Sequence, residues 1–263
     1  MEFTPVAHLE RRLRGLTIGH KIHFLECTDS TNTVALSLAR EGASEGEVVI
    51  TDRQLKGRGR LAGRRWQSPP GRNLYMSVIL RPPLPPSRAA SLTLVAGVSV
   101  AEALDRYCPD RVELKWPNDV LIEGKKVCGI LTEMMTRGKE IECVVVGIGV
   151  NILMKRDEFD PEFRDKATSL LEASDHPPDR RQVTEEIIRK LDHWYGIFLR
   201  DGFRTVRERW LHFASLLGRH VTVENLNSRE RGVVAGIDEE GALLLRGDDG
   251  RVVSVLSGDV SPS

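Results

Sequence analysis

Six cationic side chains and three glycines fall within thirteen residues, 53–65, that contain no carboxylate. The segment reads RQLKGRGRLAGRR, and Trp66 follows it directly. Arginine stays charged at any working pH and can bind a carboxylate or phosphate through two hydrogen bonds, while glycine lets the backbone approach a ligand closely. The composition therefore predicts an anion-binding loop, and a solvated basic loop is the simpler alternative.

Three further stretches could supply the rest of a site: KWPNDV at 115–120, KKVCGI at 125–130 and VVVGIGVNI at 144–152. Lys126 heads an apolar run, where its ammonium group can be buried only beside an anion. Pro117 keeps Asn118 and Asp119 out of a regular strand, although a plain turn would have the same sequence. The glycines of the third stretch predict a close approach between backbone and ligand.

With Asp29-Ser30-Thr31-Asn32 upstream, these stretches in this order resemble the biotin protein ligases, over residues 20–260. Enzymes of that family join biotin to a carrier lysine through biotinyl-AMP. The resemblance implies an α+β fold: a mixed β-sheet with flanking helices (1–216), followed by a small SH3-like domain (217–263). It also implies the ligands biotin, ATP and Mg²⁺, with the biotin carboxyl carrier protein of a biotin-dependent carboxylase as acceptor.

The same resemblance implies roles for single residues. Catalysis falls to Lys126, Arg60 and Asp119, and Asp119 would also help to hold Mg²⁺. The residues matched to biotin contacts are Ser30, Thr31, Gln54, Gly57, Arg58, Lys126 and Gly129. The residues matched to contacts with ATP or the adenylate are Arg58, Arg60, Trp66, Asn118 and Asn151.

The loop departs from the family at one point. The family reads G-R-G-R-x-G-R, whereas this chain has one residue more between Arg60 and Gly63. Arg58 and Arg60 keep their spacing from Gln54, so the departure affects only the assignments that follow them.

The implied chemistry explains the need for cations. A carboxylate attacks the α-phosphorus of ATP, so two anions must be brought together, and fixed positive charges must offset their repulsion. The chain offers six such groups near the motifs: Arg58, Arg60, Arg64, Arg65, Lys115 and Lys126.

Sequence periodicity predicts the elements that position these residues. Strands are expected at 20–26, 47–51, 74–80, 111–116, 119–123, 125–134 and 140–150. Helices are expected through 33–40, from Ser87 through 107, and at 182–200 and 203–215, the first capped by oxygens of Asp29 to Thr31. From Arg219 onward, short β segments separated by turn residues predict a five-stranded barrel of SH3 type.

Composition excludes several other classes of protein. The absence of a long apolar run or signal peptide predicts a cytoplasmic protein that binds no membrane. Four cysteines without a C-x-x-C pair predict reduced thiols, with Cys128 and Cys143 in the core. The net charge is zero and only 19 residues precede the first expected strand, so no DNA-binding domain and no DNA partner are expected.

Three alternative functions are left open by the sequence. A lipoate or octanoate ligase would share the fold, a regulator could bind biotin without catalysis, and a nucleic-acid-binding module could use the basic loop. The resemblance also allows a homodimer formed through an exposed sheet edge, which no residue of this chain specifies.

Overall fold

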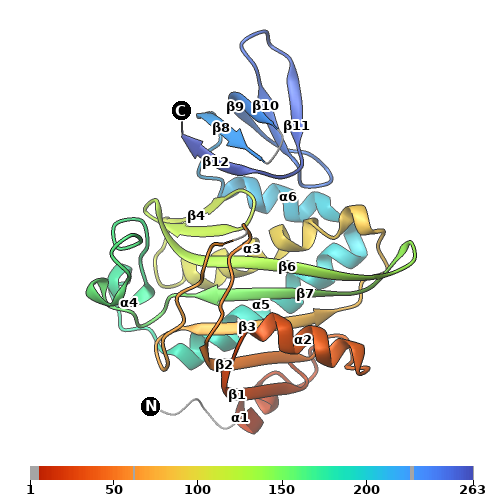
Figure 1. Ribbon diagram of the computed structural model, residues 1–263, viewed down its shortest axis with the longest axis vertical. Coiled ribbons are helices and arrows are strands. Elements are labelled where there is room, and N and C mark those ends of the chain that lie inside the picture. Colours follow the sequence, from red (N-terminus) through yellow and green to blue (C-terminus); the bar gives the residue numbers. More distant parts are fainter. Residues whose placement is uncertain (1–5, 62, 226–227, 263) are drawn as a thin grey trace.

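A seven-stranded mixed sheet forms the centre of the computed structural model, which describes residues 6–61, 63–225 and 228–262 (Figure 1). Its strands lie in the order β1-β2-β3-β7-β6-β5-β4, and the β1–β2 pair is parallel whereas the other pairs are antiparallel. The strands are β1 Ile22–Thr28, β2 Val48–Gln54, β3 Leu74–Leu80, β4 Val112–Lys115, β5 Asp119–Ile122, β6 Lys125–Arg137 and β7 Glu140–Val150.

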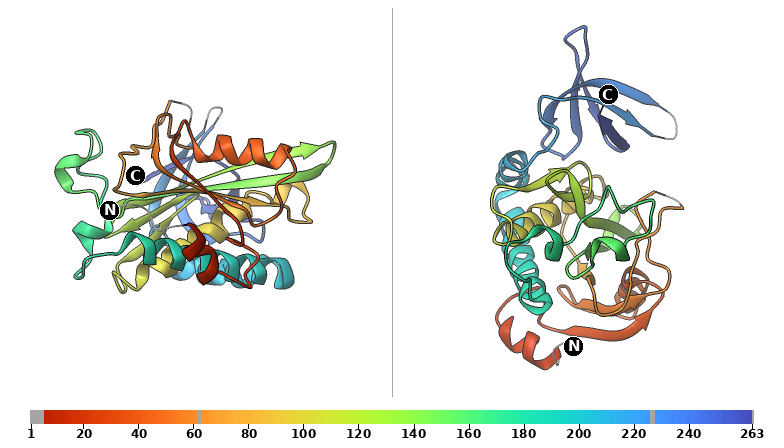
Figure 2. Two further views of the ribbon diagram at one scale, coloured as in Figure 1. Left: turned by 90° about the horizontal axis from the view of Figure 1, so that it is seen from below. Right: turned by 90° about the vertical axis from the view of Figure 1, so that its left-hand side faces the viewer.

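Helices cover both faces of this sheet (Figure 2). On one face, α3 (Ser91–Asp105) and α5 (Arg180–Asp201) pack on each other, and α3 also packs on the strands. On the other face lies α2 (Thr31–Arg40). Successive side chains of a strand point to opposite faces, so β3 is buried along its whole length. The remaining helices are α1 Val6–Arg12, α4 Leu170–Ala173 and α6 Phe203–His212, with short 3-10 turns at Pro86–Arg88 and Arg156–Glu158.

A second, five-stranded antiparallel sheet follows, in the order β11-β10-β9-β8-β12. Its strands are β8 His220–Glu224, β9 Arg229–Ile237, β10 Leu243–Arg246, β11 Val252–Val255 and β12 Asp259–Pro262. Its buried side chains belong to the same hydrophobic cluster as those under α3 and α5. The Trp116 indole also donates a hydrogen bond of 3.0 Å to the carbonyl of Gly241. The two sheets therefore share one continuous apolar core.

The predicted fold class is confirmed, with local differences. The long helix begins at Ser91 rather than Ser87, because the Pro85-Pro86 pair starts a 3-10 turn. Ser30 is the N-cap of α2, yet its side chain makes no capping hydrogen bond, so that part of the prediction is wrong. Helices α1 and α4 were not predicted. The boundary at residues 216 and 217 stays a prediction.

Candidate active site

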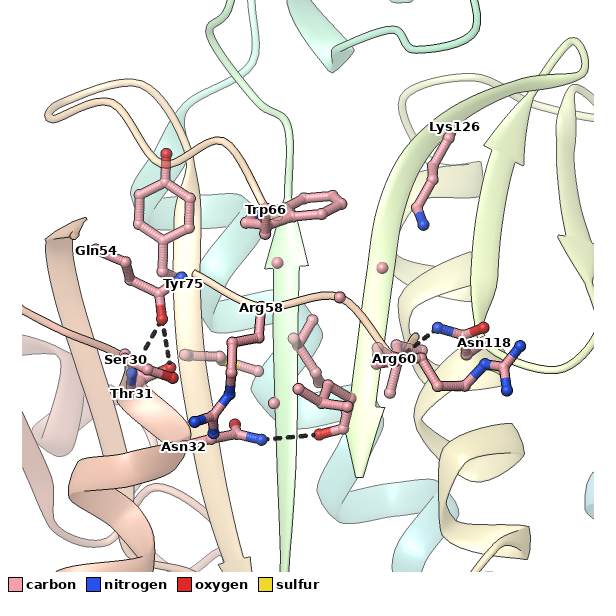
Figure 3. A pocket seen from close by; sticks show the side chains of 18 residues that line it. Ser30, Thr31, Asn32, Gln54, Arg58, Arg60, Trp66, Tyr75, Asn118 and Lys126 are labelled. Carbon is pink, nitrogen blue, oxygen red and sulfur yellow. Dashed lines mark hydrogen bonds between the residues drawn. The ribbon is translucent and has the colours of Figure 1, made fainter. Parts of the chain in front are cut away.

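Two adjoining cavities lie where the basic loop between β2 and β3 crosses β6 and β7, and Figure 3 shows the first of them. The first cavity is lined by α2, the ends of β2 and β3, the loop, β6 and β7. The second cavity is larger and is lined by the loop, residues 115–126, Asn151, residues 159–167 and Asp259. The residues that line both are Gly59, Arg60, Trp66, Asn118 and Lys126.

The first cavity has a wall of neutral hydrogen-bonding groups. Ser30 and Thr31 begin α2 and are 5% and 4% exposed. Gln54, the last residue of β2, accepts a hydrogen bond of 3.0 Å from the Thr31 backbone N–H and donates one of 3.2 Å to Ser68. The chain turns from strand to helix here, so three predicted biotin contacts, Ser30, Thr31 and Gln54, come together. This wall suits a neutral polar head group that both donates and accepts.

Arg58 reaches from the loop towards Asn32 at the edge of this cavity (Figure 3). Its Nη2 atom lies 3.0 Å from Glu133 Oε2, and Asn32 Nδ2 donates to the same oxygen over 2.7 Å. Neither Asn32 nor Glu133 was predicted as a site residue. Glu133 lies in a strand that the sequence predicts from its apolar pattern alone. Only the contact between Glu133 and Arg58, which depends on the folded structure, indicates a role for this carboxylate.

Trp66 lies against the backbone of β6 and β7, where Gly129 and Gly149 are paired across the strands. A Cβ atom at Gly149 would lie 2.6 Å from the Trp66 ring, and one at Gly129 would lie 3.0 Å from it. A Cβ atom at Gly147 would overlap the Asn32 amide. The close approach predicted at Gly147 and Gly149 is therefore made by side chains of the protein itself.

Lys126 lies at the junction of the two cavities, and its neighbour Lys125 points to solvent as expected. Lys126 Nζ lies 2.6 Å from Asp119 Oδ1 and 5.6 Å from the centre of the Trp66 ring. This oxygen of Asp119 is buried and accepts no well-aligned hydrogen bond from the described residues. It could therefore accept a second cation, and one carboxylate completed by phosphate oxygens is a usual arrangement for Mg²⁺.

Asn118 and Asn151 are partly engaged by the protein. Asn118 exchanges two 2.9 Å hydrogen bonds with the backbone of Ile130, which ties the segment after the cis Trp116-Pro117 bond to β6. Asn151 is 5% exposed, lines the second cavity and donates to the Thr168 carbonyl over 3.1 Å. Both residues can still present polar atoms to a ligand in that cavity.

Gly57 lines neither cavity, unlike the other predicted site residues. A Cβ atom there would come within 2.9 Å of Ser68 Oγ, so glycine lets the two arms of the loop pack together. Its neighbours Arg58 and Arg65 form an antiparallel bridge, and Trp66 N–H donates to the Gly57 carbonyl over 3.0 Å. The loop thus folds back on itself. Its tip contains the extra residue of the family comparison, and Ala62 there lies outside the described residues.

The tip of the loop also contacts the second sheet. Arg60 Nη2 donates a hydrogen bond of 2.7 Å to the carbonyl of Gly258, just before β12. Arg64 lies 3.8 Å from the carboxylate of Asp259, which itself lines the second cavity. These contacts could not be predicted, because nothing in residues 258–259 distinguishes them from other turn residues. They join the loop to the C-terminal sheet.

Fold and site together define a class of protein: ligases built on one mixed sheet, with an arginine-rich loop over the site and a lysine between two ligand cavities. Residues 24–151 match the biotin/lipoate A/B protein ligase family, and residues 216–261 match the biotin protein ligase C-terminal domain. No helix in the described part of the chain combines the length and apolar character needed to span a bilayer.

Known proteins resemble the chain over nearly its whole length. It is 36% identical over 248 residues to the bifunctional ligase/repressor BirA of Bacillus spizizenii, covering 94% of this chain and 76% of that protein. A biotin ligase for acetyl-CoA carboxylase from Paracoccus denitrificans is 37% identical, covering 86% and 94%. The biotin protein ligase of Aquifex aeolicus, solved with biotin and ATP, superposes with a TM-score of 0.78 at 32% identity, covering 92% and 97%. The chain belongs to the biotin protein ligase family and is a biotin ligase.

Proposed function

We propose that the protein activates biotin with ATP and transfers the biotinyl group to a lysine of a biotin carboxyl carrier protein. One observation supports this proposal above all. Eleven of the twelve residues predicted for the site, all but Gly57, line one or both of the two adjoining cavities. The relative from Aquifex aeolicus was solved with biotin and ATP, which supports the same pair of ligands here.

The first cavity suits biotin. The ureido ring of biotin donates and accepts hydrogen bonds, as do Ser30, Thr31 and Gln54. A lipoyl or octanoyl chain has no such head group, so binding it would cover these polar groups without pairing the donors and acceptors that they do not use on one another. This contrast favours biotin over lipoate or octanoate as the substrate.

In the first half-reaction, a biotin carboxylate oxygen attacks the α-phosphorus of ATP, giving biotinyl-AMP and releasing pyrophosphate. Lys126 lies between the two cavities, where the carboxylate and the α-phosphate would meet, and its charge would stabilise the developing negative charge. Arg58 would face biotin and Arg60 would face both ligands. Trp66, Asn118 and Asn151 would contact the nucleotide.

Mg²⁺, which arrives with ATP, would neutralise phosphate charge beside Asp119. In the second half-reaction, the neutral ε-amine of the carrier lysine attacks the adenylate carbonyl, an amide forms, and AMP leaves. The second cavity, which is wide and open to solvent, is where that lysine would enter.

Three further points belong to the same proposal. We place the protein in the cytoplasm, where ATP and carboxylases occur together. We take residues 1–216 as the catalytic domain and residues 217–263 as the SH3-like domain. We expect a homodimer formed through the β1 edge of the large sheet, because β4, the other outermost strand, already hydrogen-bonds to residues 213–215 through Leu114.

The test is pyrophosphate release from MgATP on adding biotin, with lipoate and octanoate as parallel substrates and no carrier protein present. Release with biotin alone would establish adenylation and its substrate together. Release with lipoate or octanoate instead would show that the protein is a lipoate or octanoate ligase of the same fold. If the folded protein binds biotin but releases no pyrophosphate with any acid, it is a biotin-binding regulator.

A further inference from the structure

A continuous chain of hydrogen bonds runs along the floor of the first cavity from helix α2 to the basic loop. Ser77 Oγ lies 2.7 Å from Thr31 Oγ1 and 2.6 Å from Asn32 Oδ1, and all three residues are buried. Asn32 Nδ2 donates to Leu131 O over 3.1 Å and to Glu133 Oε2 over 2.7 Å. Arg58 Nη2 donates to both carboxylate oxygens of Glu133, over 3.0 and 3.2 Å.

The direction of this chain follows from counting protons. The Asn32 amide uses both N–H groups on Leu131 and Glu133, so its oxygen faces Ser77 and can only accept. Ser77 has one hydroxyl proton and must donate it to Asn32. The 2.7 Å contact between Ser77 and Thr31 is then made with the Thr31 hydroxyl as donor, in preference to its longer contact of 3.3 Å with Gln54 Oε1, which still accepts from the Thr31 backbone N–H. The two hydroxyl protons and one amide proton of Asn32 therefore point along the chain towards Glu133.

Glu133 thus has two donors, one from the helix side and one from the loop. Its carboxylate lies 3.0 Å from Arg58 of the loop, just outside the first cavity, whose own lining residues are neutral or cationic. A carboxylate beside the proposed anion site would repel biotin unless it served another purpose. Among the described residues, the hydrogen bonds of Arg58 use Nη2 alone. The Nε and Nη1 groups are left for a ligand.

We propose that Glu133, oriented by Asn32, is a positioning residue that holds Arg58 at the first cavity, so that the guanidinium can receive the biotin carboxylate on its other edge. This inference rests on the proposed function. It adds two residues to the site, neither of which needs to touch biotin. Arg58 lines the first cavity and not the second, so the effect of Glu133 is expected on biotin rather than on ATP.

A double-mutant cycle tests this proposal, with biotin binding measured by calorimetry on the full chain. The proteins are the parent, Glu133→Gln, Arg58→Ala and the double variant. Losing the charged pair should weaken biotin binding about threefold to tenfold. If Glu133 acts through Arg58, its substitution should have no further effect once Arg58 is alanine. Biotin amide, which has no carboxylate, should bind equally to the parent and to Glu133→Gln.

Glu142→Gln is the matched control, because Glu142 pairs with Arg137 over 3.1 Å at the far end of the β6–β7 hairpin. It should bind biotin like the parent. Equal losses in both Arg58 backgrounds, or an equal loss with biotin amide, would assign Glu133 a purely structural role and overturn the inference. Unchanged biotin binding in Glu133→Gln would also overturn it. Failure of the parent to bind biotin would instead refute the proposed function. Thermal melting of each variant identifies any that fail to fold.

Discussion

Lys126 is half-buried, and the carboxylate of Asp119 lies 2.6 Å from its ammonium group. A lysine in this position is ready for an anion, because a negative ligand between the cavities would meet an ammonium group already held in place. The aromatic face of Trp66 is 5.6 Å away and adds to that preorganisation. Asp119 therefore orients the lysine.

We expect Lys126→Ala to lower the rate of biotinyl-adenylate formation by about a hundredfold or more, the effect of losing roughly 2.7 kcal/mol of transition-state stabilisation. The measurement is single-turnover pyrophosphate release. Lys125→Ala is the control, since its side chain is exposed at the adjacent position. Near-normal rates in Lys126→Ala would remove this lysine from the mechanism.

The carboxylate of Glu47, which directly precedes β2, contributes to stability rather than to the proposed site. Burial alone would raise the pKa of Glu47, but hydrogen bonds from His23, Ser44 and Lys21 outweigh burial and lower it from 4.5 to about 2. A lowered carboxyl pKa stabilises the fold above the unfolded value and loses this effect as the pH falls towards the folded value.

Glu47→Gln should therefore be less stable than the parent near neutral pH, by about 3 kcal/mol at most. The difference should shrink as the pH falls below 4.5 and should vanish near pH 2. Urea unfolding of both proteins at a series of pH values measures it. A difference that does not change with pH would show that packing, rather than charge, accounts for the loss.

At the scale of elements, strands with a clear apolar pattern could be predicted from the sequence. Side-chain contacts between segments far apart in the chain could not. Residues 74–80 and 140–150 form strands with the predicted limits, because largely apolar runs that contain Val and Ile and lie between turn residues have few alternatives. The anion site indicated by the loop composition stays a prediction. Asn32 and Glu133 were missed because their role depends on which strands become neighbours, and pairing between distant segments cannot be inferred from local spacing.

The glycines of β6 and β7 make a hollow in the sheet for Trp66. We expect Gly149→Ala to weaken biotin binding at least about tenfold and to destabilise the fold by about 1–3 kcal/mol, because the new methyl group would press on a rigid ring 2.6 Å away. Calorimetry with biotin and urea unfolding measure the two effects.

Gly196→Ala is the matched control for this substitution. Gly196 lies inside α5, and the nearest atom to a Cβ there is Arg200 Nη1 at 3.5 Å. Alanine is the better helix former, so this variant should be as stable as the parent or slightly more stable. Unaltered biotin binding in Gly149→Ala would mean that Trp66 can move without cost.

The loop between β2 and β3 lines the cavities, and near its tip it also contacts the second sheet. For Arg60→Gly we expect looser retention of the adenylate, because the side chain that faces both cavities and anchors the tip to Gly258 is lost. The measurement is labelling of bystander lysines on an unrelated protein by released biotinyl-AMP. Leakage equal to that of the parent would assign retention to the later arginines of the longer loop.

At the scale of the whole molecule, the two sheets are joined by more than a linker. Their apolar side chains form one cluster, and Leu114, Trp116 and Ser91 each hydrogen-bond to the segment that contains the second sheet or leads into it. A C-terminal domain attached to the large domain only through a flexible linker would have a hydrophobic core of its own.

We therefore expect the full chain to unfold in urea as one unit. All four tryptophans, including Trp116 and Trp210, precede residue 216, so their fluorescence reports on the large sheet and its helices. Hydrogen exchange over residues 220–262 reports on the second sheet. The two midpoints should coincide, and clearly separated midpoints would show that the C-terminal sheet unfolds independently.

The hydrogen bond between Arg60 and Gly258 links residues 198 positions apart in the chain. A genetic screen for altered biotinylation should therefore recover substitutions near residues 258–259 alongside those in the ligand cavities. Variants at Asp259 would still fold and bind biotin, whereas a Cβ atom at Gly258 would lie 2.4 Å from Val223. They would differ in how long the reactive intermediate stays enclosed, and hence in which lysines of the cell become modified.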